Sequence, residues 1–172
     1  MTEIRHVVPD PYLEEPVAAD LMCTAVLAVE ATETVGMAVE LAARLGVHHL
    51  PVLRGGRCVG VIDDRELIAA RLQATVSGHP AMVGDLPGLT TADIGPYAPL
   101  SAVAATLLEE HTDALLVRTA DEDVVGLITV QDVVRAMAHR PSRRPYAAWS
   151  QSAALFTIEP VLPAQQHASA VR

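Results

Sequence analysis

An internal duplication constrains the fold of this sequence more than any other feature. Asp20-Leu21-Met22 is matched by Asp85-Leu86-Pro87, 65 residues later, and Gly60-Val61-Ile62 is matched by Gly126-Leu127-Ile128, 66 residues later. Self-similarity at such a period is typical of structural units that bury their cores by packing on one another. A copy of roughly 60 residues buries little surface alone, so we expect the two copies to share a core.

Within each copy, the apolar periodicity predicts the order strand, helix, strand, strand, helix. In the first copy an apolar strand at 26–29 precedes a helix at 35–45, which Gly46 ends, and a strand follows at 49–53. The second copy repeats this order with a strand at 92–94 and a helix beginning near Pro99. The predicted fold class is α/β (α+β), with two pseudo-symmetric β-α-β-β-α repeats packed as one module. The predicted boundaries are an N-terminal arm at 1–16, a first repeat at 17–73, a linker at 74–82, a second repeat at 83–138 and a C-terminal tail at 139–172.

The amino-acid composition disfavours some classes of binding partner. Aromatic residues make up 3% of the 172 residues and the formal net charge is −9. Few aromatic rings and an acidic surface disfavour nucleic acids and anionic membranes, although Arg140, Arg143 and Arg144 are clustered near the start of the tail. The apolar runs are shorter than the roughly 18 residues of a membrane span, and the N-terminus has no signal-peptide core. Cys23 and Cys58 form no CxxC pattern, so we expect a cytoplasmic protein.

The junction between an apolar strand ending at Ile128 and a helix beginning at Val130 is the first place where the sequence indicates chemistry. Thr129 stands at the N-cap position, and Asp132 follows three residues later. One interpretation is a capping box, in which both side chains satisfy free N–H groups of the first turn. The other interpretation adds a ligand, because a helix N-terminus attracts phosphate and a carboxylate accepts hydrogen bonds from ribose hydroxyls. This stretch alone leaves both interpretations open.

The motifs of the first copy, taken as a set, resemble the CBS domain, named for cystathionine β-synthase. They are Asp20-Leu21-Met22, His49-Leu50-Pro51-Val52, Gly55-Gly56 and Gly60-Val61-Ile62. Two copies in tandem resemble a Bateman module over residues 17–138. The resemblance implies clefts for adenosine nucleotides or adenosyl compounds, such as AMP, ADP, ATP or S-adenosylmethionine. It also implies a homodimer formed through the helices of two modules.

The resemblance further implies which residues contact the ligand. In the family, a Ser or Thr after the glycine-containing strand contacts phosphate, and an Asp three residues later holds the ribose. The second copy has both, as Thr129 and Asp132. The base contacts implied for the same cleft come from the first strand and from the strand after the first helix of that copy: Thr91, Ala92, Ile94, Ala114 and Leu115.

The first copy departs from this pattern, with Asp63 in the place of the hydroxyl and Glu66 in the place of the aspartate. Asp63 is a good N-cap, but a carboxylate about 4 Å from a phosphate oxygen costs roughly 4 kcal/mol at an effective dielectric constant near 20. Arg65 offsets part of this repulsion. We therefore expect a mainly structural role for this cleft, which would accept an uncharged nucleoside more weakly. Its candidate residues are Val26, His49, Leu50, Asp63 and Glu66.

Other groupings of side chains do not favour catalysis or metal binding. His48 and His49 are adjacent on a strand and so point to opposite faces, and no nucleophile elbow, P-loop or zinc-protease motif occurs. We predict a stand-alone, non-enzymatic regulatory module with no catalytic residue, no metal site and no required cofactor. Its ligand would change the packing or dimerisation of the module. The alternative is a ligand-free dimerisation or scaffolding domain whose helices and tail contact an unknown partner protein. In either case we expect the tail to pack through Trp149 and Phe156, locally or on a partner subunit.

Overall fold

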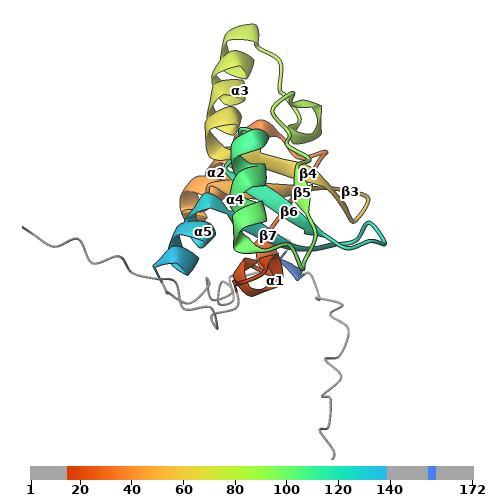
Figure 1. Ribbon diagram of the computed structural model, residues 1–172. Helices are drawn as coiled ribbons and strands as arrows, with labels where there is room; N and C mark the ends of the chain where they lie inside the picture. Colours follow the sequence, from red (N-terminus) through yellow and green to blue (C-terminus); the bar gives the residue numbers. More distant parts are fainter. Residues whose placement is uncertain (1–14, 139–154, 158–172) are drawn as a thin grey trace, which may run out of the picture.

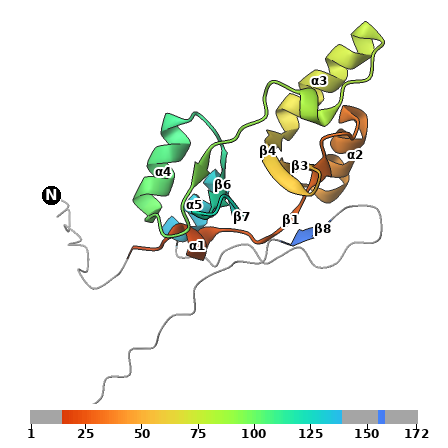
Figure 2. The ribbon, with the colours of Figure 1, turned by 90° about the vertical axis from the view of Figure 1, so that its right-hand side faces the viewer.

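The computed structural model describes residues 15–138 and 155–157, so most of the predicted arm and tail, including Trp149, lies outside the described residues. The described chain forms two lobes, which Figure 2 shows side by side. Each lobe contains a three-stranded sheet and two longer helices. The predicted fold, two similar mixed α/β repeats packed together, is therefore confirmed.

The first lobe is built on the sheet β2-β3-β4, in which β2 is parallel to β3 and β3 is antiparallel to β4. The Gly55-Gly56 turn between β3 and β4 uses left-handed backbone at both residues, with φ of 59° and 78°. Helix α2 begins at the N-cap Thr34 and ends at Gly46, also left-handed, as the sequence predicts. The elements are β2 Val29–Glu30, α2 Val35–Leu45, β3 His49–Arg54, β4 Arg57–Asp63 and α3 Asp64–Ser77.

The second lobe repeats this arrangement, with the sheet β5-β6-β7 showing the same sequence of parallel and antiparallel pairs. Helix α2 packs on α3 in the first lobe, and α4 packs on α5 in the second (Figure 1). Each helix in the described part of the chain is too short or too polar to cross a lipid bilayer. The elements of this lobe are β5 Asp93–Ile94, α4 Leu100–Glu109, β6 Ala114–Arg118, β7 Val124–Thr129 and α5 Val130–Met137. The short helix η1 Val83–Asp85, at the start of the second repeat, contacts β2 and β3 of the first lobe.

Three element boundaries differ from the sequence-based expectation. The predicted strand at 26–29 is divided into β1 Ala25–Leu27 and β2, and the strand predicted at 92–94 is reduced to β5. Helix α3 continues to Ser77, so residues 74–77 of the predicted linker are helical. The helix ends at Gly78 because that residue adopts left-handed backbone, with φ of 73°.

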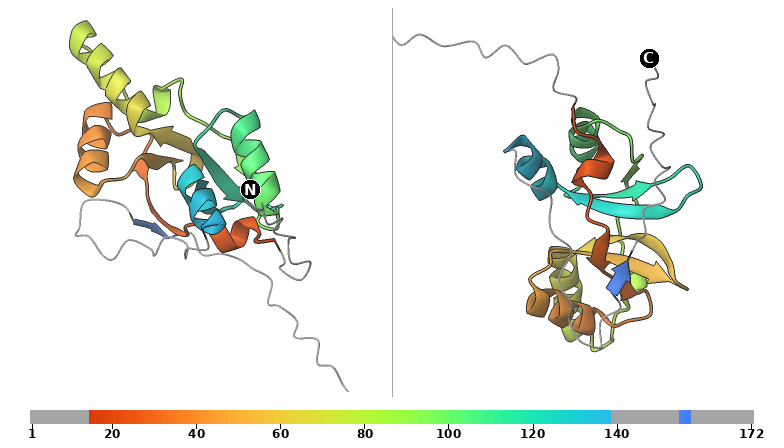
Figure 3. Two further views of the ribbon diagram at one scale, coloured as in Figure 1. Left: turned by 60° about the vertical axis from the view of Figure 1, so that its left-hand side comes forward. Right: turned by 90° about the horizontal axis from the view of Figure 1, so that it is seen from below.

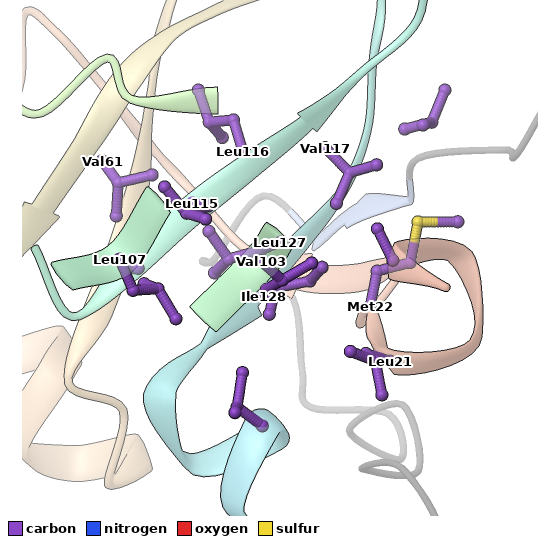
Figure 4. Close-up of a cluster of buried hydrophobic side chains, with 14 of the residues drawn as sticks. Leu21, Met22, Val61, Val103, Leu107, Leu115, Leu116, Val117, Leu127 and Ile128 are labelled. Carbon is purple, nitrogen blue, oxygen red and sulfur yellow. The ribbon is translucent and has the colours of Figure 1, made fainter. Parts of the chain in front are cut away.

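The two lobes exchange their N-terminal segments. Helix α1 Ala18–Leu21 stands at the start of the first repeat in sequence, yet Leu21 and Met22 belong to the hydrophobic core of the second lobe, beside Val103 and Ile128 (Figure 4). In return, Val83 from the start of the second repeat is buried in the core of the first lobe. Neither lobe therefore has a complete core without a segment from the other.

Backbone hydrogen bonds fix this exchange at equivalent places in both repeats. Cys23 pairs with Leu127 of β7 through N···O distances of 2.9 and 3.0 Å, and Thr90 pairs with Val61 of β4 at 2.8 and 2.9 Å. Beside these pairs the crossing segments lie against Gly126 and Gly60, where a Cβ would fall 2.8 Å from Met22 Cβ and from the Thr90 carbonyl oxygen, respectively. The glycine in each repeat motif is required for this close approach.

Strand β1 lies between the lobes and is paired with a segment from the end of the chain. It forms an antiparallel ladder with β8 Leu155–Thr157, the blue arrow in Figure 3. In this ladder Val26 is opposite Phe156. A strand near the C-terminal end of the chain, β8, therefore pairs with a strand near its N-terminal end, β1.

Candidate functional site

A cavity of about 500 Å³ lies between the two lobes, and we call it the inter-repeat cavity. Its walls come from the segment around β1, from the start of β3, and from the N-terminal turns of α3 and α5. Both repeats therefore build one site. The lining residues are Cys23, Val26, Leu27, Val47, His48, His49, Asp63, Asp64, Arg65, Asp113, Leu127, Thr129, Val130, Gln131 and Asp132.

Thr129 and Asp132 form a buried pair in the wall of this cavity. Thr129 is the N-cap of α5, as predicted, and its hydroxyl donates to Asp132 Oδ2 at 2.7 Å. The Thr129 backbone N–H donates to the same oxygen at 2.9 Å. The other oxygen, Asp132 Oδ1, is buried and accepts no hydrogen bond from any residue that the structure describes. The Asp132 carboxylate thus caps α5 through Oδ2, and Oδ1 remains able to accept a hydrogen bond from a ligand.

Charged side chains surround the cavity at the start of α3. Asp63 is the N-cap of α3 and accepts from the Glu66 backbone N–H at 2.7 Å. Arg65 donates to Asp63 at 3.1 Å and to Asp113 of the second repeat at 2.6 Å. These hydrogen bonds hold the pKa of Arg65 above its ordinary value, so the guanidinium stays charged. The Arg65–Asp113 pair bridges the two repeats at the cavity.

Two histidines line the cavity beside these charges. His48 Nδ1 lies 2.6 Å from Asp64 Oδ2, and the His48 side chain is exposed. Burial lowers the pKa of His49, although the nearby carboxylates of Asp113, Asp63 and Asp64 act in the opposite direction. In the described part of the chain, no three His, Cys, Asp or Glu side chains lie close enough to hold a metal ion.

A second, smaller cavity of about 330 Å³ occupies the pseudo-symmetric position. It lies against β4 and the segment that precedes β5, and it shares Asp63, Arg65 and Asp113 with the inter-repeat cavity. Glu66, at the position equivalent to Asp132, instead lies over Gly88, where an added Cβ would be 2.9 Å from its Oε1. This cavity is lined by His49, Val61, Asp63, Arg65, Pro87, Gly88, Leu89, Thr90, Glu110, His111, Thr112 and Asp113.

The structure groups the predicted site residues differently from the sequence-based expectation. Thr129 and Asp132 share the inter-repeat cavity with Val26, His49 and Asp63, which were expected in a separate cleft. The residues expected to hold the base beside Thr129 do not line this cavity, and neither do Leu50 and Glu66. The physical reason is the exchange of N-terminal segments, which places β1 rather than β5 beside the start of α5.

The predicted site residues that do not line the inter-repeat cavity lie in the hydrophobic cores or at the surface. Ala114 and Leu115 are fully buried, and Ala92 and Ile94 pack against the core of the second lobe. Leu50 is buried in the core of the first lobe, and Thr91 is exposed.

The candidate residues from the sequence do not include the other lining residues of this cavity, which are Cys23, Leu27, Val47, His48, Asp64, Arg65, Asp113, Leu127, Val130 and Gln131. Asp113 stands 65 residues after His48, so the repeat offset makes the two positions equivalent, and the structure places both side chains at this cavity.

Comparison with known proteins agrees with this architecture. A family model described as CBS domain matches residues 17–73 and 93–139. The chain belongs to the CBS domain family. The predicted tandem CBS arrangement is thereby confirmed, and the residues between the two matches include the crossing segment that joins the first lobe.

Solved CBS domain structures resemble this tandem CBS chain over most of its described length. The protein CBSX2, crystallised in complex with AMP, is 31% identical with a TM-score of 0.60, and the match covers 72% of this chain and 96% of the chain in that crystal structure. The CBS domain pair of protein MJ0100, in complex with 5′-methylthioadenosine and S-adenosylmethionine, is 16% identical with a TM-score of 0.62, covering 73% of this chain and 98% of that one. The second likeness concerns the fold alone.

A much longer curated relative contains a region that is similar in sequence to this chain. An A-adding tRNA nucleotidyltransferase of Geobacter sulfurreducens is 30% identical over 129 residues, which is 74% of this chain. The chain spans 14% of the length of that enzyme. The similarity therefore concerns one part of the relative.

Proposed function

We propose that this tandem CBS chain is a non-enzymatic regulatory module that binds an adenosine nucleotide or adenosyl compound in the inter-repeat cavity. The observation that carries the proposal is Asp132 Oδ1, a buried acceptor without a partner among the described residues, in the wall of a cavity of about 500 Å³. A buried polar atom left unpaired costs about 1–3 kcal/mol. A ribose hydroxyl entering the cavity would donate to this oxygen and remove that cost.

The remaining walls have the chemistry that a nucleoside requires. Val26, Leu27 and Leu127 provide an apolar surface for a base, in a chain where rings for stacking are scarce. Cavities of about 300–1,000 Å³ with a few convergent polar groups are typical of small-molecule sites. The AMP bound to the 31% identical protein CBSX2 supports an adenosine-type ligand.

Occupancy of this cavity would be transmitted because both repeats contribute to its walls. Arg65 of the first repeat contacts Asp113 of the second at 2.6 Å, and α5 begins at the same cavity. A ligand that binds one arrangement of the repeats more tightly shifts the population toward it by the ratio of its affinities. The regulated partner is then a second copy of the chain or another protein that contacts the helices.

Isothermal titration calorimetry with adenosine, AMP, ADP, ATP and S-adenosylmethionine tests the proposal. We expect at least one compound to bind, and Asp132→Asn to weaken that binding by at least about tenfold because the acceptor is replaced by a donor. Asp20→Asn is the matched control: Asp20 accepts from the Val17 N–H at 3.0 Å in the same i, i+3 geometry but lies outside the cavity. If no compound binds at millimolar concentration, the proposal fails.

A second candidate function, a ligand-free dimerisation or scaffolding domain, is favoured by exposed apolar side chains. Ile68, Leu72 and Val76 repeat along one face of α3, and Val134 and Met137 are exposed on α5. Apolar stripes of this kind mark protein–protein contacts. A thermal shift with any nucleotide supports the regulatory proposal, whereas dimerisation without any such shift supports scaffolding.

A further inference from the structure

We infer that the inter-repeat cavity selects a nucleoside whose 5′ substituent is neutral or cationic and rejects adenine nucleotides that carry phosphate. This inference rests on the proposed function and narrows its ligand class. It starts from Asp132, whose side chain is nearly fully buried with one oxygen unpartnered among the described residues. That oxygen needs a hydrogen-bond donor, which the ribose hydroxyls of adenosine and of AMP provide equally, so selection between them depends on the charges that the 5′ substituent meets.

The charges around the inter-repeat cavity also disfavour a ligand that carries phosphate. Among the described lining residues, Asp63, Asp64, Asp113 and Asp132 carry carboxylates, and Arg65 carries the guanidinium. Arg65 already donates to Asp63 at 3.1 Å and to Asp113 at 2.6 Å, so its charge is offset within the protein. A phosphate would enter a region of net negative charge, and the repulsion is strengthened where water is partly excluded.

Three backbone N–H groups at the starts of α3 and α5 are already used by the protein and so are not available to a phosphate. A phosphate at a helix N-terminus requires free backbone N–H groups. In α3 the Asp64 N–H donates to the His48 carbonyl at 2.9 Å, and the Glu66 N–H donates to Asp63 at 2.7 Å. At α5 the Val130 N–H donates to the Asp113 carbonyl at 3.0 Å. These N–H groups are occupied by the protein itself.

The smaller cavity offers no better place for a phosphate. Asp63, Arg65 and Asp113 line it as well, and Glu110 adds a further carboxylate. A neutral thioether or hydroxyl at the 5′ position avoids the repulsion in either cavity. A cationic amine or sulfonium would be attracted by Asp63, Asp64 and Asp113.

Titration of the full chain with adenosine, 5′-methylthioadenosine and S-adenosylmethionine, compared with AMP and ATP, tests the inference. We expect the phosphate-free compounds to bind at least about tenfold more tightly than AMP at low ionic strength, with a smaller difference at high salt. AMP binding as tightly as adenosine would overturn the inference and leave the proposed function standing. Binding of none of the compounds would overturn the proposed function as well.

Substitutions that remove one carboxylate from the cavity provide a second test of the inference. Asp113→Asn frees Arg65 from one partner, and Asp63→Asn keeps an N-cap residue on α3. In each variant we expect the adenosine-to-AMP affinity ratio to fall by about tenfold. Asp121→Asn, which changes the net charge equally at an exposed turn, should leave the ratio unchanged. Circular dichroism verifies that each variant is folded, and an unchanged ratio in both cavity variants contradicts the inference.

Discussion

Gly60 of β4 lies so close to Thr90 that a Cβ on Gly60 would stand 2.8 Å from the Thr90 carbonyl oxygen. The contact brings the segment before β5 onto the edge of the first repeat, where Thr90 and Val61 exchange backbone hydrogen bonds. The pair Gly126 and Met22 makes the equivalent contact in the other lobe. Two glycines thus permit the exchange of segments that builds both cavities.

The first prediction concerns this contact. We expect Gly60→Ala to lower the free energy of unfolding by about 1–3 kcal/mol, because the added Cβ meets the Leu89 side chain at 2.6 Å and the Thr90 carbonyl oxygen at 2.8 Å, and the oxygen belongs to the backbone and cannot rotate away. Urea denaturation measures the change. Gly95→Ala is the control, because nothing lies within 4 Å of the position of its Cβ. Equal stability of the two variants would show that the segments do not cross as described.

The second prediction concerns the hydroxyl that Asp132 accepts. Thr129→Val keeps the shape of the side chain but removes the donor at 2.7 Å from the buried carboxylate oxygen. We expect a loss of about 1–3 kcal/mol in the free energy of unfolding, since a buried charged acceptor loses a partner. Thr129→Ser retains the hydroxyl and should lose less. Thermal and urea unfolding measure the stability of both variants. A Thr129→Ser variant as unstable as Thr129→Val would contradict the role of the hydroxyl.

The third prediction is a pH dependence through His49. Burial lowers the pKa of His49 in the folded state, while Asp113, Asp63 and Asp64 oppose the shift and His48 adds to it. Below the unfolded pKa of about 6.5, the unfolded chain therefore binds a proton that the folded chain does not. Stability should be fully present above that pH and decrease as the pH falls toward the lowered folded pKa.

Urea unfolding between about pH 5.5 and pH 8 measures this dependence. We expect His49→Gln to flatten the decrease in stability on the acid side. His79→Gln, at an exposed position after α3, should keep the slope of the unsubstituted protein. A His49→Gln variant with that same slope would rule out His49 as the titrating group.

The fourth prediction concerns the proposed homodimer. Leu72 and Val76 on α3 expose 64% and 89% of their surface, and burying such side chains in a second copy would be favourable. We expect light scattering to give the mass of a dimer, and Leu72→Glu to weaken the dimer by at least about tenfold. Gln73→Glu adds the same charge one position along the same helix and should leave the dimer intact. A monomeric unsubstituted protein would argue against the dimer.

Much of the local structure could be predicted because its causes are local. Gly46 ends α2 with left-handed backbone, and Asp63 and Thr129 cap α3 and α5, as their positions in the sequence indicate. The ends of helices and strands were less predictable where the residues are compatible with more than one secondary structure. Residues 74–77 can continue a helix or begin a linker, and the left-handed Gly78 decides between them.

The candidate site was predicted in part. Thr129 and Asp132 do lie together at a cavity, because a capping box is specified within four residues. Their neighbours were assigned from the same repeat, whereas Val26 and His49 come from the other one. Repeat periodicity does not say which copy supplies each wall.

The duplicated β-α-β-β-α unit could be inferred from the residues alone, since periodicity, caps and turn glycines act over a few residues and occur in both copies. Tertiary structure alone decided that Met22 packs in the second lobe and Val83 in the first. The physical reason is that two similar cores offer nearly equivalent places to an apolar segment. The choice between them depends on contacts distant in sequence, such as Cys23 with Leu127 and Thr90 with Val61.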